Sequence, residues 1–198
     1  MEFLPKQQIE HKPFQAYKQP LEREYKTKVK AFLFNQRKEA LEAVYGGRGV
    51  GRDGKIYEKL QKELQEVYTS AIFKGQFSVR EESGMSAELP FGTDDEMVNR
   101  FVDTKASFVV SNFKALIDNL IDAFEEFRSK NGDNKEIFAD KLREIYNYLT
   151  QKSHLVTVNE IEAAFSFGRN IEMQSFAKEI ESALMAEKNK EGEGIEDV

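Results

Sequence analysis

The residues best suited to phosphate chemistry lie in one glycine-rich stretch, residues 46–55. Gly49, Gly54 and Lys55 have the spacing G-x-x-x-x-G-K of a phosphate-binding loop. Gly49, Gly51 and Gly54 also have the spacing G-x-G-x-x-G of a dinucleotide-binding turn. Both patterns require a β-strand that leads into the loop. The sequence before this stretch has helical periodicity instead, so a nucleotide site is not the interpretation that we favour.

A flexible connection between two helices explains the glycines better. Ile56 stands where the first pattern requires a Ser or Thr that would bind magnesium. A second interpretation stays open. Arg48, Arg52 and Lys55 are candidate contacts to nucleic-acid phosphates, because they place three positive charges in one exposed loop.

The chain has few residues of the types that most often act in catalysis. The chain has no Cys, and its only two histidines are His11 and His154. Ser153 precedes His154, but a lone histidine is more often structural than catalytic. The acidic run 94–96 could bind a hard cation, yet acids are expected at a helix N-terminus because of the helix dipole. We therefore predict that the chain is not an enzyme and has no metal site and no cofactor.

Helices are the elements that must position these residues. Apolar side chains recur every three or four residues over most of the chain, which is typical of amphipathic helices. The predicted fold is mainly α, an irregular multi-helix domain with at most a short strand or hairpin. We expect at least five helices, over residues 20–45, 56–73, 94–128, 134–150 and 157–186. A short strand is allowed between Gln76 and Met85, where Phe77 and Val79 alternate with polar residues.

Three parts of the chain are distinguished by composition. Residues 1–18 are predicted to be an extended N-terminal arm, because Pro5 and Pro13 disfavour a continuous helix. Residues 19–177 form the predicted helical domain. Residues 178–198 are an acidic extension rich in Glu, Lys and Gly, and we expect it to be partly disordered.

The predicted core follows from the helical spacing. A Phe-rich stripe from Val98 to Phe127 is expected to be core rather than a ligand site. Two pairs with capping spacing, Asp133 with Glu136 and Thr157 with Glu160, predict where the last two helices begin. The side chains expected to be largely buried are Phe113, Leu120, Leu142, Ile145, Ile161 and Phe165.

Composition and charge limit the partners. With 198 residues, 40% of them hydrophobic, the chain can bury a core. It has no apolar run long enough to span a membrane and no apolar signal-peptide core near its N-terminus, so we expect a soluble, unexported protein without a membrane partner. The net charge is −6, divided into +6 over residues 1–80 (16 Lys/Arg, 10 Asp/Glu) and −12 over residues 81–198 (13 Lys/Arg, 25 Asp/Glu). The two halves therefore favour different partners, or complement one another in an oligomer.

Three segments resemble one protein family. Near the C-terminus, the residues Glu160, Ile161, Ala164, Phe165, Gly168 and Arg169 match the pattern E-(I/V)-x-x-A-(F/Y)-N-x-G-R, with Ser166 in place of the Asn. The first predicted helix has aromatic residues before a Gln36–Arg37 pair, and residues 142–146 read LREIY. All three segments are similar to the phage minor head proteins typified by phage Mu gpF, whose domain is also found joined to portal proteins. Val158 and Asn159 stand where that family usually has Arg and Thr, and the chain has no Trp, unlike the second half of the family domain.

The resemblance implies a structural protein of a phage or prophage. Its role would be that of a minor head component in head morphogenesis near the portal vertex, docking on portal or capsid proteins. It would be found in the virion, and in the bacterial cytoplasm during assembly. Glu160 and Arg169 become candidate partner contacts, with solvated helix charges as the alternative.

Other functions stay open at this stage. One is a portal protein's C-terminal extension, which is the same domain in a longer chain. Another is a nucleic-acid-binding helical module, whose basic N-terminal half would lie near packaged double-stranded DNA. Homo-oligomerisation is a further expectation from the charge division.

Overall fold

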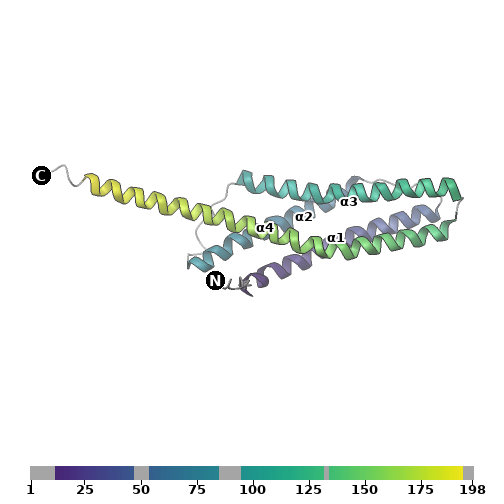
Figure 1. Ribbon diagram of the computed structural model, residues 1–198, viewed down its shortest axis with the longest axis horizontal. Helices are drawn as coiled ribbons and strands as arrows, with labels where there is room; N and C mark the ends of the chain where they lie inside the picture. The colour runs from purple at the N-terminus through teal and green to yellow at the C-terminus, as the bar shows by residue number, and fades with distance from the viewer. Residues whose placement is uncertain (1–11, 47–53, 85–94, 132–133, 194–198) are drawn as a thin grey trace, which may run out of the picture.

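The protein is an elongated, antiparallel arrangement of helices (Figure 1). The computed structural model describes residues 12–46, 54–84, 95–131 and 134–193. Its helices are α1 (Lys12–Tyr45), α2 (Gly54–Ser83), α3 (Asp95–Asn131) and α4 (Lys135–Glu193). No strand occurs in these ranges, so the prediction of a mainly α fold is confirmed. With 59 residues, α4 is about 90 Å long, and its C-terminal end extends beyond the other helices.

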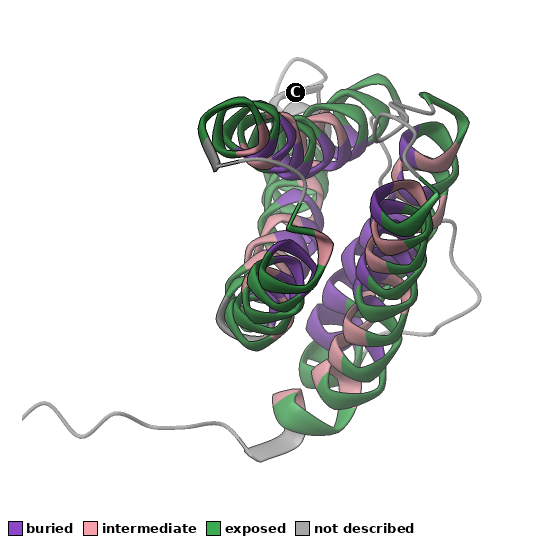
Figure 2. Ribbon diagram, turned by 90° about the vertical axis from the view of Figure 1, so that its right-hand side faces the viewer, coloured by how far each residue is buried: buried purple, intermediate pink, exposed green. Residues whose placement is uncertain are grey.

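The core lies between the helices, on the faces that they turn toward one another (Figure 2). Phe113, Leu142, Ile161 and Phe165 are buried, as predicted. The predicted core residues Leu120 and Ile145 are only partly buried and pack against the core from its edge.

The helices do not share their contacts evenly. α4 packs along both α1 and α2, and its contact with α2 is the most extensive in the molecule. α3 packs mainly on α2 and touches α4 at few places. One side of the bundle, between α3 and α4, is therefore loosely packed.

Two glycines allow α2 and α4 to cross in direct backbone contact. A Cβ atom at Gly75 would lie 2.1 Å from the carbonyl oxygen of Phe165, and one at Gly168 would lie 2.0 Å from the carbonyl oxygen of Ile72. Cβ atoms do not approach backbone oxygens this closely, so no other residue fits either position without moving a helix.

The expectation of at least five helices is wrong, because residues 135–193 form one helix. The capping spacing predicts Thr157 at the start of the last helix, but Thr157 lies inside α4, where its hydroxyl donates to the Ser153 carbonyl at 2.6 Å. A Thr that bonds back in this way leaves the helix intact. At the true start of α4, Asn134 Oδ1 accepts the Ile137 backbone N–H at 3.4 Å, and Asp133 lies outside the described residues.

The short strand near Phe77 and Val79 is also wrong, because α2 continues to Ser83. Val79 is buried, as are the polar side chains of Gln76, Ser78 and Arg80 in this turn. Tertiary burial therefore maintains a helix that the local pattern does not favour. Gly84, with a φ of +65°, ends it in the left-handed conformation typical of helix C-termini.

The extended arm is wrong for residues 12–18, which form the first turns of α1. Pro13 lies in the first turn, where a missing N–H costs little, but Pro20 lies inside the helix. Tertiary contacts offset that cost, since the Tyr17 ring stacks on Phe165 with the centroids 6.5 Å apart.

The acidic extension is helical where the structure describes it. Residues 178–193 continue α4 to Glu193, although disorder was expected beyond the first turns. Residues 1–11 and 194–198, the remaining parts of the predicted arm and extension, lie outside the described residues.

The glycine crossing predicts a specific cost for a single methyl group. Gly168→Ala should lower the free energy of unfolding by about 1–3 kcal/mol, because the backbones of α2 and α4 must separate. Gly54→Ala is the control, since a Cβ there meets nothing within 4 Å. Urea denaturation of both variants measures the difference; equal stabilities would contradict the close crossing.

Candidate docking groove between α3 and α4

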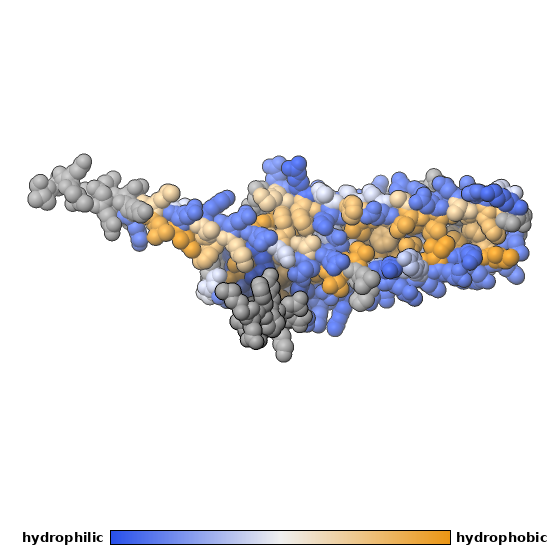
Figure 3. Space-filling view, in the orientation of Figure 1, coloured by the Kyte–Doolittle hydropathy of each residue, from blue (hydrophilic) through white to orange (hydrophobic). Residues whose placement is uncertain are grey.

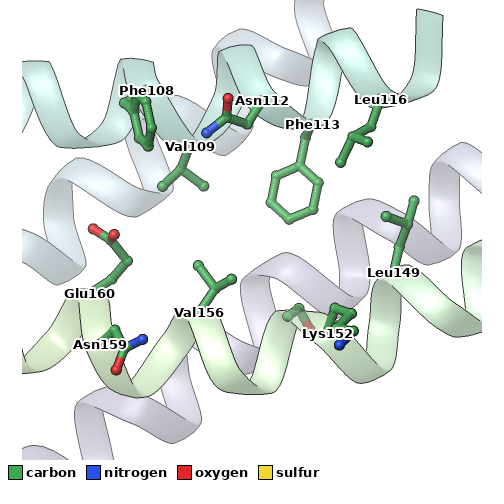
Figure 4. A pocket seen from close by; sticks show the side chains of 11 residues that line it. Phe108, Val109, Asn112, Phe113, Leu116, Leu149, Lys152, Val156, Asn159 and Glu160 are labelled. Atoms are coloured by element: carbon green, nitrogen blue, oxygen red, sulfur yellow. The ribbon is translucent and has the colours of Figure 1, made fainter. Parts of the chain in front are cut away.

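An open apolar groove runs between α3 and α4. In its first half, Val109 and Phe113 point from α3 toward α4, and Val156 points back from α4 (Figure 4). This half has a volume of about 310 Å³. Its apolar lining consists of Phe108, Val109, Phe113, Leu116, Leu149 and Val156.

The second half continues along the same two helices toward the turn that joins them. It has a volume of about 220 Å³. Its main apolar lining consists of Leu120, Phe124, Phe127, Phe138, Leu142 and Ile145. α3 residues 108–127 and α4 residues 138–160 line the two halves in opposite order, so the halves lie end to end along this pair of antiparallel helices. We call the two halves together the α3–α4 groove.

Aromatic contacts bring α3 and α4 together at the two ends of this groove. The rings of Phe101 and Phe167 stack with their centroids 4.1 Å apart at one end. The rings of Phe124 and Phe138 are in contact near the turn. Between these pairs, apolar side chains of the groove lining such as Phe108 and Leu116 are exposed to solvent.

The groove presents side chains that a single chain would normally bury. Phe108 is 60% exposed on its rim, and Leu116 and Phe127 are exposed too. The prediction that the Phe-rich stripe is core is therefore wrong at Leu116 and Phe127 and correct at Phe113 and Phe124. An apolar band along the molecule marks this face (Figure 3). Contiguous apolar surface of this kind typically marks an interaction site.

Glu160, a predicted partner contact, lies at the end of the groove that is far from the turn between α3 and α4. It has partners within the chain. Its Oε2 accepts the Tyr68 hydroxyl at 3.0 Å and pairs with Lys105 Nζ at 3.3 Å. The Tyr25 hydroxyl lies 3.4 Å from that of Tyr68. Because Tyr68 donates its one hydroxyl proton to Glu160, Tyr25 is the donor to Tyr68. These hydrogen bonds lead from Glu160 into the core. Burial raises the pKa of Tyr68, and the nearby Tyr25 and Glu160 raise it further, so the phenol stays neutral.

Arg169, the other predicted partner contact, also binds within the chain. Its guanidinium makes a forked contact with the Glu82 carboxylate, at 2.9 and 3.0 Å, and donates to the Ser78 hydroxyl at 2.7 Å. It also lies 4.3 Å from the centre of the Phe14 ring. The structure therefore does not bring Glu160 and Arg169 together, and each ties α4 to α2.

A buried ion pair lies beside Arg169. Arg80 Nε contacts Glu172 Oε1 at 2.5 Å, and the two side chains are only 5% and 7% exposed. Neighbouring Gln76 is fully buried, and its amide has no hydrogen-bond partner in the part of the chain that the structure describes. This pair and the glycine crossing hold the same stretch of α2 against α4.

One of the three candidate phosphate contacts lies in the described part of the chain. Lys55 is exposed in the first turn of α2, and Arg48 and Arg52 lie outside the described residues. Among the described side chains, no group of three His, Asp or Glu residues could hold a metal ion. No described helix has both the length and the apolar composition to cross a membrane.

The sequence pattern predicts part of the lining as core but does not predict the groove. The signal was available in Phe108 and Val109, which widen the apolar stripe of α3 beyond what one neighbouring helix can cover. A scan against protein-family models and searches of curated proteins and of solved structures found no match. The described residues thus define a class only: an antiparallel, all-helical protein with an open apolar groove.

The buried ion pair predicts an asymmetry between single and double variants. Arg80→Met should lower the free energy of unfolding by about 3–5 kcal/mol, because the Glu172 carboxylate is left buried without its partner. Adding Glu172→Leu should recover much of that loss. Lys38→Met, which removes an exposed partner of Glu42, should cost less than about 1 kcal/mol. Chemical denaturation tests all three, and additive losses in the double variant would contradict the pairing.

Proposed function

We propose that this chain is a structural protein of a phage or prophage head, a minor head component near the portal vertex. It acts by receiving an apolar helix of a portal or capsid protein in the α3–α4 groove. The observation that supports this proposal is the groove itself, which leaves aromatic and aliphatic side chains exposed along two helices. A groove of this form is suited to an amphipathic helix that inserts a row of apolar anchors.

The resemblance to minor head proteins supplies the proposed setting, and the groove supplies the proposed contact surface, which includes Glu160 at one end but not Arg169. Glu160 and Arg169 are engaged inside the chain, so the groove is the more suitable surface for a partner. A portal protein that carries this domain as its C-terminal extension would use the groove in the same way.

A groove variant tests this proposal. Phe108→Asp places a charge in the apolar rim and should weaken binding to the portal or capsid protein of the same genome at least about tenfold, the loss expected for an interface anchor. Phe34→Asp is the matched control, since Phe34 is an exposed phenylalanine on α1, outside the groove.

Pull-downs and titrations at moderate salt measure the effect. Association of the unaltered chain and of Phe34→Asp, lost in Phe108→Asp, is the expected result. Equal binding by both variants would show that the groove is not the contact, and no binding of the unaltered chain to either head protein would overturn the assignment.

A further inference from the structure

The C-terminal segment of α4, residues 173–193, carries a second group of apolar side chains that are exposed in the described part of the chain. Phe176, Ile180 and Leu184 follow one another at intervals of four residues, so they lie on one face of the helix. Ile180 is 45% exposed and Leu184 is 54% exposed. The segment projects beyond the rest of the molecule (Figures 1 and 3).

From these two surfaces we infer that, in the free protein, the C-terminal segment of one copy docks in the α3–α4 groove of a second copy. The inference rests on the groove being a docking site, as proposed above, and names its occupant before a head partner binds. The segment cannot reach the groove of its own chain, because α4 is one continuous helix that leads away from the groove. A second copy is therefore the source of the segment.

The segment and the groove have matching lengths. The groove follows α3 from Phe108 to Phe127, which is about 29 Å at the helical rise of 1.5 Å per residue. The C-terminal segment spans about 30 Å by the same measure. The segment can therefore lie along the groove, and its apolar face, about 12 Å long from Phe176 to Leu184, would cover part of the apolar lining.

The charges of the two surfaces are complementary. The C-terminal segment has five Glu and three Lys, a net charge of −2. The charged side chains among the described groove-lining residues are Lys141, Lys152 and Glu160. Glu160 is paired with Lys105, and Lys141 is paired with Glu144, so Lys152 is the positive charge that the groove presents to the acidic segment.

Exchange in both directions closes the assembly. If each copy gives its segment to the other, both grooves and both segments are covered, and the product is a two-fold symmetric dimer. One-way exchange would leave one groove and one segment open and would add further copies without limit. The expected species is therefore a dimer with α4 of the two copies running antiparallel.

Sedimentation velocity of the full chain at micromolar concentration tests the inference. The unaltered protein should sediment as a dimer, and Ile180→Asp with Leu184→Asp should convert it to a monomer. Met185→Asp is the control, because Met185 is the most exposed large apolar residue on the segment but lies off the face of Ile180 and Leu184. These side chains are exposed within one chain, so the helical circular dichroism signal should stay unchanged in all variants.

Mixing two monomeric variants gives the sharper result. Phe108→Asp has a damaged groove and an intact segment, and the Ile180→Asp, Leu184→Asp chain has the reverse. Each should be monomeric alone, whereas the mixture should form a weaker dimer through its one intact segment and one intact groove. A monomeric unaltered protein, or a dimer that survives both variants, would overturn the inference.

The outcome is separable from that of the proposed function. A monomer that still binds a portal or capsid protein through the groove would overturn only the dimer. A segment-dependent dimer that binds neither head protein would support the dimer and overturn the head assignment.

Discussion

The backbone contact between α2 and α4 is the constraint on which the rest of the structure depends. Gly75 and Gly168 remove the two Cβ atoms that would hold these helices apart. Close approach then allows the shorter-range interactions beside it, the Arg80–Glu172 pair and the forked contact of Arg169 with Glu82. A buried ion pair is weak evidence for stability by itself, because desolvation offsets much of its Coulomb energy. Here it fixes which turn of α2 meets which turn of α4.

The open groove is a consequence of the same packing. α4 is occupied by α1 and α2 on its inner faces, and α3 is held mainly by α2. The two aromatic pairs and the Lys105–Glu160 ion pair bring α3 back to α4, and between them the middle of α3 has no described helix covering one side. The described residues thus leave apolar side chains exposed along α3 and α4, and Ile180 and Leu184 on the projecting end of α4 are exposed as well.

The family-like residues near the C-terminus have a structural role in this protein. Ile161, Ala164 and Phe165 are buried, and Gly168 makes the crossing. Arg169 binds Glu82 on α2. The residues on which the proposed resemblance rests therefore pack α4 on its neighbours. The proposed docking uses the groove rather than Arg169, because Arg169 is bound within the chain.

The sequence by itself determined the helical class and most of the core, because the apolar spacing of residues such as Phe113, Leu142 and Ile161 depends only on the helical repeat. It did not determine where helices end. The capping pattern at Thr157 and the alternation at Phe77 and Val79 are local signals, and burial of the same turns against neighbouring helices outweighs them. The sequence does not predict the groove for the same reason. Periodicity predicts an apolar face on α3, but tertiary packing decides whether another helix covers that face. Here the glycine crossing packs α4 on α2, so α4 does not cover the whole apolar face of α3.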